Sequence, residues 1–144
     1  MSAPAVANVE LVGAMMELIE RDEQQALGEL VEEHAHPEVE WMPLIAAAVE
    51  GGYHGRDGAR RFFEDLLSSF EVRYHELEFR QLDDDVVLVL CRMGLRGRES
   101  GVETSTRAGT VYEFENGLIR RGRVYDDQPE AVSAAQALAA DGGA

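Results

Sequence analysis

The second half of the chain alternates apolar and polar residues with a period of two, and this pattern constrains the fold more than any other feature. Such alternation predicts β-strands that bury one face. Four runs show it, at 72–82, 86–95, 102–114 and 118–125. The last two runs are separated by Asn116-Gly117, a pair typical of a tight hairpin turn. Because parallel strands need a crossover of about a dozen residues, short connections predict an antiparallel meander.

The first half carries helical patterns instead. Apolar residues at helical spacing predict three amphipathic helices, at 5–21, 23–34 and 56–70. Pro37 favours an end to the second helix, and 39–42 alternates like a short strand. The alanine-rich stretch 130–140 favours a last short helix. This order predicts an α+β domain with helices packed on one face of a bent sheet.

The charge balance excludes several classes of partner. The 144 residues have 28 Asp plus Glu against 13 Arg and no Lys, which gives a net charge of −15. Such a charge repels phosphate backbones and anionic lipids, so we expect no nucleic-acid partner and no membrane partner. Without Lys, catalysis through a Schiff base is impossible. Unbroken apolar runs such as Val86 to Cys91 are far shorter than the ~20 residues of a membrane helix.

The domain organisation is simple. Residues 1–144 show no repeat and no linker, so we expect a single domain with a core at about 8–138 and loose tails at 1–4 and 141–144. Cys91 is the only cysteine, and the N-terminus has no signal-peptide pattern. Both observations favour a cytoplasmic protein.

Four local sequences, taken in this order, resemble the SnoaL-like group of the nuclear transport factor 2-like superfamily. They are HPEVEWMP from His36, GGYHGRDGARRFF from Gly51, GRESGVE from Gly97 and FENGLIRRGRVYDDQPEA from Phe114. The resemblance covers about residues 8–138. It implies a cone-shaped, cystatin-like α+β barrel, in which three N-terminal helices pack on a strongly bent, mostly antiparallel sheet that encloses an apolar pocket. It also implies a homodimer, which we expect to form through the outer face of the sheet.

Members of this superfamily include ketosteroid isomerase, limonene epoxide hydrolase, polyketide cyclases and proteins without catalysis, so the fold alone does not fix the function. Ketosteroid isomerase-like chemistry needs a carboxylate base, a Tyr and a protonated acid. In this chain, the resemblance places Trp41 at the position of the base, Met15 or Met16 at that of the Tyr, and Thr110 at that of the acid. The last-strand Asp of the limonene-type hydrolases falls on Val124. The resemblance therefore favours neither reaction.

SnoaL-type polyketide cyclases are thought to use an Asp on the last strand as acid and base, and Asp126 lies at or next to that place. If Gly122 and Val124 line the pocket, strand alternation puts Asp126 on the same face. An apolar surrounding would make its carboxylate more basic, as a general base that works near pH 7 requires. His54 is the best partner for it. Alternatively, Asp126 is a solvated strand end and His54 a loop histidine in water.

The resemblance implies a pocket wall and a ligand. We expect the wall to contain Met16, Trp41, Tyr53, Phe63, Thr110, Tyr112, Gly122 and Val124. The expected ligand is a small apolar or polycyclic molecule, with no cofactor. The four histidines have no ligand spacing, so no metal site is expected. The function is thus predicted to be small-molecule binding, with an isomerase or cyclase reaction through Asp126 as one form. The alternative is a non-catalytic binding protein or a protein-interaction scaffold.

Several arginines lie in or next to the predicted strands. A guanidinium group can bind a carboxylate or a phosphate through two parallel hydrogen bonds. Against a background of 28 acidic residues, most of these arginines are expected to pair with glutamates across strands instead. They are Arg92, Arg96, Arg98, Arg107, Arg120, Arg121 and Arg123.

Overall fold

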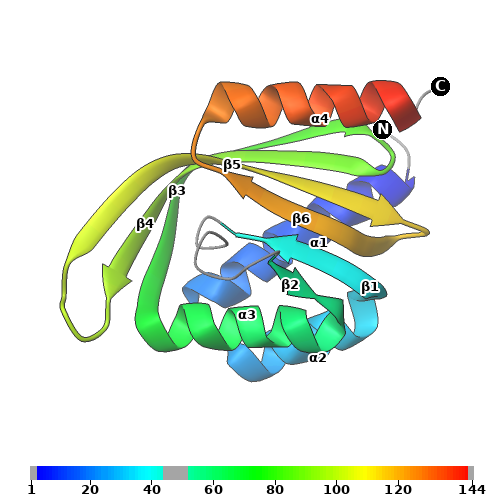
Figure 1. The fold of residues 1–144 in the computed structure, drawn as a ribbon. Coiled ribbons are helices and arrows are strands. Elements are labelled where there is room, and N and C mark those ends of the chain that lie inside the picture. Colours follow the sequence, from blue (N-terminus) through cyan, green and yellow to red (C-terminus); the bar gives the residue numbers. More distant parts are fainter. Residues whose placement is uncertain (1–2, 44–51, 143–144) are drawn as a thin grey trace.

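The fold is built on one long, bent sheet (Figure 1). The structure is a computed structural model, and it describes residues 3–43 and 52–142. The strand order is β2-β1-β6-β5-β4-β3. Strands β2 and β3 lie at the two edges, so the sheet is strongly bent, as expected, and does not close on itself. The strands are β1 (Ala35–Met42), β2 (Tyr53–His54), β3 (Phe70–Asp83), β4 (Val86–Gly97), β5 (Glu103–Glu115) and β6 (Leu118–Tyr125).

The four long strands β3 to β6 form the expected antiparallel meander. Asn116 and Gly117 both have positive φ, at 53° and 79°, as a tight hairpin turn of this type requires. Strand β1 pairs parallel with β6, and β2 pairs antiparallel with β1. The sheet is therefore mostly antiparallel.

Three helices cover the inner face of the sheet: α1 (Ala3–Glu20), α2 (Gln24–His34) and α3 (Gly55–Ser69). Figure 1 shows α2 and α3 together beneath the sheet. Strand alternation turns Val72, Val87 and Val89 toward these helices, where they join one large apolar core. Leu27 of α2 and Phe62 of α3 belong to the same core.

A fourth described helix, α4 (Gln128–Gly142), follows the three N-terminal helices and lies on the outer face of the sheet, which confirms the last helix expected at 130–140. Ala131 and Ala135 are fully buried against Leu88, Leu90 and other outward-facing strand residues. The helix lies close to β5, because a Cβ on Gly109 would be 2.4 Å from the Cβ of Ala131.

Helices extend to both ends of the described chain. Helices α1 and α4 include residues 3–4 and 141–142, which we expected to lie in loose tails. Residues 1–2, 44–51 and 143–144 lie outside the described residues. In the part of the chain that the structure describes, no helix has the length and apolar character needed to cross a membrane.

Candidate functional site

A small cavity lies between the inner face of the sheet and helices α1 and α3. Its volume is about 60 Å³. The helices contribute apolar side chains to its wall, and the rest come from strands β1 and β3 to β6 and from Pro43 just after β1. The wall consists of Met16, Ile19, Trp41, Pro43, Phe62, Leu66, Tyr74, Cys91, Met93, Leu95, Ala108, Thr110, Tyr112 and Val124.

Strand alternation explains why these residues meet. On β4, every second residue from Cys91 to Leu95 faces the cavity. On β5, the same holds from Ala108 to Tyr112. Tyr74 of β3 joins them because it pairs in register with Met93 of β4.

Trp41 is the centre of an aromatic cluster at one end of the cavity. Its ring centroid lies 5.6 Å from that of Phe62, 5.7 Å from that of Phe63 and 5.8 Å from that of Tyr112. The ring lies against β6 at Gly122, where a Cβ would be 3.2 Å from the nearest ring carbon. A residue with a side chain at position 122 would therefore push the indole away. Trp41 fills space that would otherwise enlarge the cavity.

The polar groups in the wall are neutral near pH 7. Burial raises the pKa of Tyr112 and, with help from the nearby Tyr112 and Cys91, the pKa of Tyr74. Burial also raises the pKa of the Cys91 thiol to about 11, so this thiol is protonated and a poor nucleophile. Together with Thr110, these side chains offer hydrogen bonds to an oxygen of a bound molecule.

The structure does not bring the two expected catalytic residues to the cavity. Strand β6 ends at Tyr125, so its alternation stops one residue before Asp126, which is exposed in the bend that follows. The neighbouring Asp127 accepts a hydrogen bond from the backbone N–H of Glu130 at 3.1 Å and caps α4. His54 is exposed at the N-cap position of α3.

The expected wall residues divide into two groups. Met16, Trp41, Thr110, Tyr112 and Val124 line the cavity. The other three expected wall residues lie in the surrounding packing. Phe63 contacts Trp41, Gly122 lies behind the indole, and the hydroxyl of the buried Tyr53 donates a hydrogen bond to Asp65 at 2.7 Å.

Sequence reasoning missed Tyr74 and Met93 in the wall. The signal that would have found them is the pairing register of β3 with β4, which places both on the inner face beside Cys91. Cys91 ends the apolar run that begins at Val86, and it is buried, with 5% of its surface exposed.

An acidic and basic cluster lies on the outer face, away from the cavity. Arg121 of β6 donates a hydrogen bond to Glu40 of β1 at 2.7 Å and another to Glu113 of β5 at 3.3 Å. The hydrogen bond from Arg121 lowers the pKa of Glu40. Within the described ranges, no three His, Cys, Asp or Glu residues are grouped so that they could hold a metal ion.

The bent sheet, the helices on its inner face and the cavity between them define the class of protein. The profile of the SnoaL-like domain family matches residues 12–122. The chain therefore belongs to the SnoaL-like domain family. No curated protein matches it.

Solved structures with a nuclear transport factor 2-like or SnoaL-like description share the fold. A nuclear transport factor 2-like protein of unknown function from Burkholderia pseudomallei is 21% identical, with a TM-score of 0.69 over 94% of this chain and 98% of that one. A candidate SnoaL-like polyketide cyclase from Jannaschia is 18% identical, with a TM-score of 0.65 over 95% of this chain and 96% of that one. A candidate isomerase from Bacillus subtilis is 16% identical, with a TM-score of 0.73 over 94% and 95%.

Proposed function

We propose that this protein binds a small, largely apolar molecule in the inner cavity and orients it by hydrogen bonds from Tyr74, Tyr112 and Thr110. The observation that supports this is the composition of the wall: apolar and aromatic side chains with a few convergent hydroxyl groups, as ligand sites usually have.

The size of the cavity limits the ligand. A volume of about 60 Å³ holds about two water molecules at ~30 Å³ each, whereas pockets for drug-sized ligands span about 300–1,000 Å³. A polycyclic molecule would have to displace the Trp41 ring. A single small ring needs only a modest expansion, which the flexible side chains of Met16 and Met93 can supply from opposite sides.

Binding without a chemical step is the form of this function that the geometry supports best. Among the described residues of the wall, none is a carboxylate or a histidine. The tyrosines and the cysteine hold their protons firmly at neutral pH, so they are donors and not general bases. An acid/base role for Asp126, with or without His54, stays a prediction from the resemblance.

Trp41 is the only tryptophan, so its fluorescence reports on the cavity directly. We expect cyclohexanone to quench or shift this fluorescence with a saturable curve. Tyr112→Phe removes one hydroxyl and keeps the ring. It should lower the affinity for cyclohexanone about fivefold, which is the effect of losing one neutral hydrogen bond. Cyclohexane should bind equally to both proteins, because it accepts no hydrogen bond.

Tyr125→Phe is the matched control, because Tyr125 belongs to the outer cluster beneath α4. It should leave both affinities unchanged. A titration in which neither probe gives a saturable signal with the unaltered protein would contradict the proposed function.

The homodimer and the cytoplasmic location are also proposals. One end of the outer face is covered by α4 and the other is charged, whereas stable dimer interfaces have apolar centres. The homodimer therefore rests on the resemblance alone, and light scattering at tens of micromolar protein tests it. A cytoplasmic location suits a chain whose one cysteine is buried as a free thiol.

A further inference from the structure

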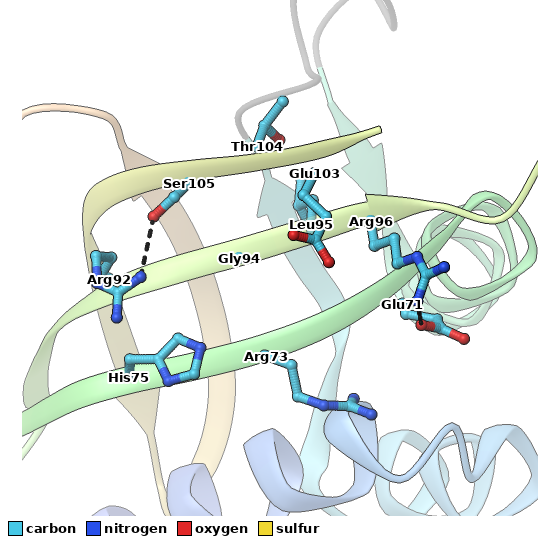
Figure 2. A pocket seen from close by; sticks show the side chains of 10 residues that line it. All are labelled: Glu71, Arg73, His75, Arg92, Gly94, Leu95, Arg96, Glu103, Thr104 and Ser105. Atoms are coloured by element: carbon cyan, nitrogen blue, oxygen red, sulfur yellow. Dashed lines mark hydrogen bonds and ion pairs between the residues drawn. The ribbon is translucent and has the colours of Figure 1, made fainter. Parts of the chain in front are cut away.

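The outer face of the sheet changes character where α4 begins. Gln128, the first residue of α4, donates hydrogen bonds to the backbone carbonyls of Cys91 and Ala108. On one side of this point, β4 and β5 present apolar residues such as Leu90 to the helix. On the other side the same strands are uncovered, and with β3 they form a hollow of about 540 Å³, which we call the outer hollow (Figure 2).

Two cross-strand rows define the charge of the outer hollow. In one row, Glu71, Arg96 and Glu103 lie side by side on β3, β4 and β5. Their signs alternate, and Arg96 forms an ion pair with Glu71 at 4.0 Å, as expected for neighbours across a sheet.

The other row has no acidic member. His75, Arg92 and Arg107 lie in register across the same three strands. His75 and Arg92 line the hollow, and Arg107 lies next to Arg92 just outside the lining. Arg92 and Arg107 are directly opposite each other, an arrangement that destabilises a sheet when nothing neutralises the two charges. Arg107 is exposed and has no ion pair with any described residue.

Few carboxylates offset these arginines. Glu76 lies 3.6 Å from Nε of Arg92, and Nη1 of Arg92 donates to the hydroxyl of Ser105 at 3.4 Å. Arg73, which also lines the hollow, donates to the backbone carbonyls of Glu20 and Val72 and forms no ion pair with any residue in the described ranges. In a chain with a net charge of −15, the outer hollow is a local site of positive charge.

Gly94 forms the floor between the two rows, as Figure 2 shows. Glycine in the middle of a strand weakens it, so a reason is needed for it here. A Cβ on Gly94 would meet its nearest neighbour, the carbonyl oxygen of Arg73, at 3.7 Å, which is an ordinary contact. Its φ is not positive either. Neither backbone conformation nor tight packing requires glycine, and what the missing side chain leaves is open space beside Arg92.

We propose that the outer hollow binds a small anion that carries a carboxylate or phosphate group, held by Arg92 and Arg107 with the Ser105 hydroxyl as a further donor. Guanidinium groups bind both kinds of anion through paired, charge-assisted hydrogen bonds. The hollow has the volume of a small-molecule site. A bound anion would also neutralise Arg107, which has no ion pair with any described residue, whereas Arg92 already pairs with Glu76.

The test titrates inorganic phosphate and succinate separately into the isotope-labelled protein and follows the amide signals of Gly94 and Ser105 by NMR. We expect saturable shifts with one site per chain for at least one of the two, and the tighter probe identifies the class of anion. Arg92→Gln should lower the affinity for that probe at least about tenfold, as expected for the loss of one charge-assisted hydrogen-bonded pair.

Arg61→Gln is the matched control. It removes the same charge from an exposed position on α3, outside the hollow, and should leave the affinity unchanged. The Cβ of Gly94→Val meets only ordinary contacts, and valine suits a strand, so this variant should keep the melting temperature and still weaken binding of the anion at least about tenfold.

Three results would overturn the proposal. The first is the absence of saturable shifts with both probes. The second is an equal loss of affinity in Arg61→Gln, since this would show a general effect of net charge. The third is a change of mass by light scattering in Arg92→Gln without any anion binding, because this would assign the surface to contact with a second copy of the chain.

Discussion

The two faces of β4 have opposite chemical character, although the residues that form them are neighbours in the sequence. Cys91, Met93 and Leu95 turn inward and close a cavity of about 60 Å³, whereas Arg92 and Gly94 turn outward into a hollow of about 540 Å³. The inner site is small and aromatic, and the outer one is larger and charged. A single strand can therefore separate an apolar ligand from an anion, because its side chains alternate between faces.

The largest expected effect tests how far the inner face depends on Trp41. Trp41→Ala removes a ring that is 5% exposed and contacts three other rings, so it should lower the free energy of unfolding by about 3–5 kcal/mol. Denaturant unfolding followed by far-UV circular dichroism measures this without the lost fluorophore. Phe79→Ala is the control. Because Phe79 is 36% exposed, this substitution should lower the free energy of unfolding by only about 1–2 kcal/mol. Equal losses would show that the cluster around Trp41 is not a special part of the core.

The next effect separates the two ends of the outer face. Gly109→Ala places a methyl group 2.4 Å from the Cβ of Ala131, so α4 must shift, at a cost of about 1–3 kcal/mol in unfolding free energy. Gly94→Ala on the uncovered end meets no such contact and should stabilise the protein by about 0.5 kcal/mol. Chemical denaturation of both variants makes the comparison. A loss for Gly94→Ala as large as that for Gly109→Ala would mean that the bend of β4 requires glycine.

The sequence predicted the meander well, because its signals are local. Alternation and the Asn116-Gly117 turn depend on residues that are adjacent in the chain. The parallel pairing of β1 with β6 depends instead on contacts between residues far apart, such as Trp41 with Gly122, and no local pattern encodes them.

The site was harder to predict than the fold, because alternation holds only while a strand stays regular. Asp126 was placed on the inner face by extending the alternation of β6 past its last residue, Tyr125. In β3, the register with β4 shifts between His75 and Glu78, and Glu76 has a φ of 56°. Such a bulge changes which residues face inward, and its position is set by pairing with the partner strand.

A smaller effect concerns the charges that β1 and β6 share on the outer face. Glu40 is hydrogen-bonded by Arg121, which lowers its pKa from 4.5. The stability from this pair is complete above that pH and is lost as the pH falls through the lower pKa of the folded state. Glu40→Gln should therefore cost up to about 1 kcal/mol at pH 7, since the Glu40 side chain is 32% exposed and solvent screens the pair.

Thermal unfolding of Glu40→Gln and the unaltered protein at pH 7 and at pH 3 measures this difference, which should shrink at the lower pH. Glu38→Gln is the control on the same strand, because Glu38 is exposed and its side chain has no ion pair with any described residue. A stability difference that does not depend on pH would show that the Glu40 carboxylate contributes nothing through its charge.

The smallest expected effect is that of Asp126→Asn, and it decides whether the end of β6 belongs to the inner site. Because Asp126 is exposed beyond the last residue of the strand, the substitution should change the free energy of unfolding by less than about 0.5 kcal/mol. The affinity for cyclohexanone, measured by Trp41 fluorescence, should also stay the same, since Asp126 does not line the cavity. A buried carboxylate would behave differently: replacing it with an amide would remove a desolvation cost and stabilise the protein near pH 7. A clear gain in stability, or a loss of turnover of about 100-fold on any substrate that the protein converts, would place Asp126 inside the site and restore its role as acid and base.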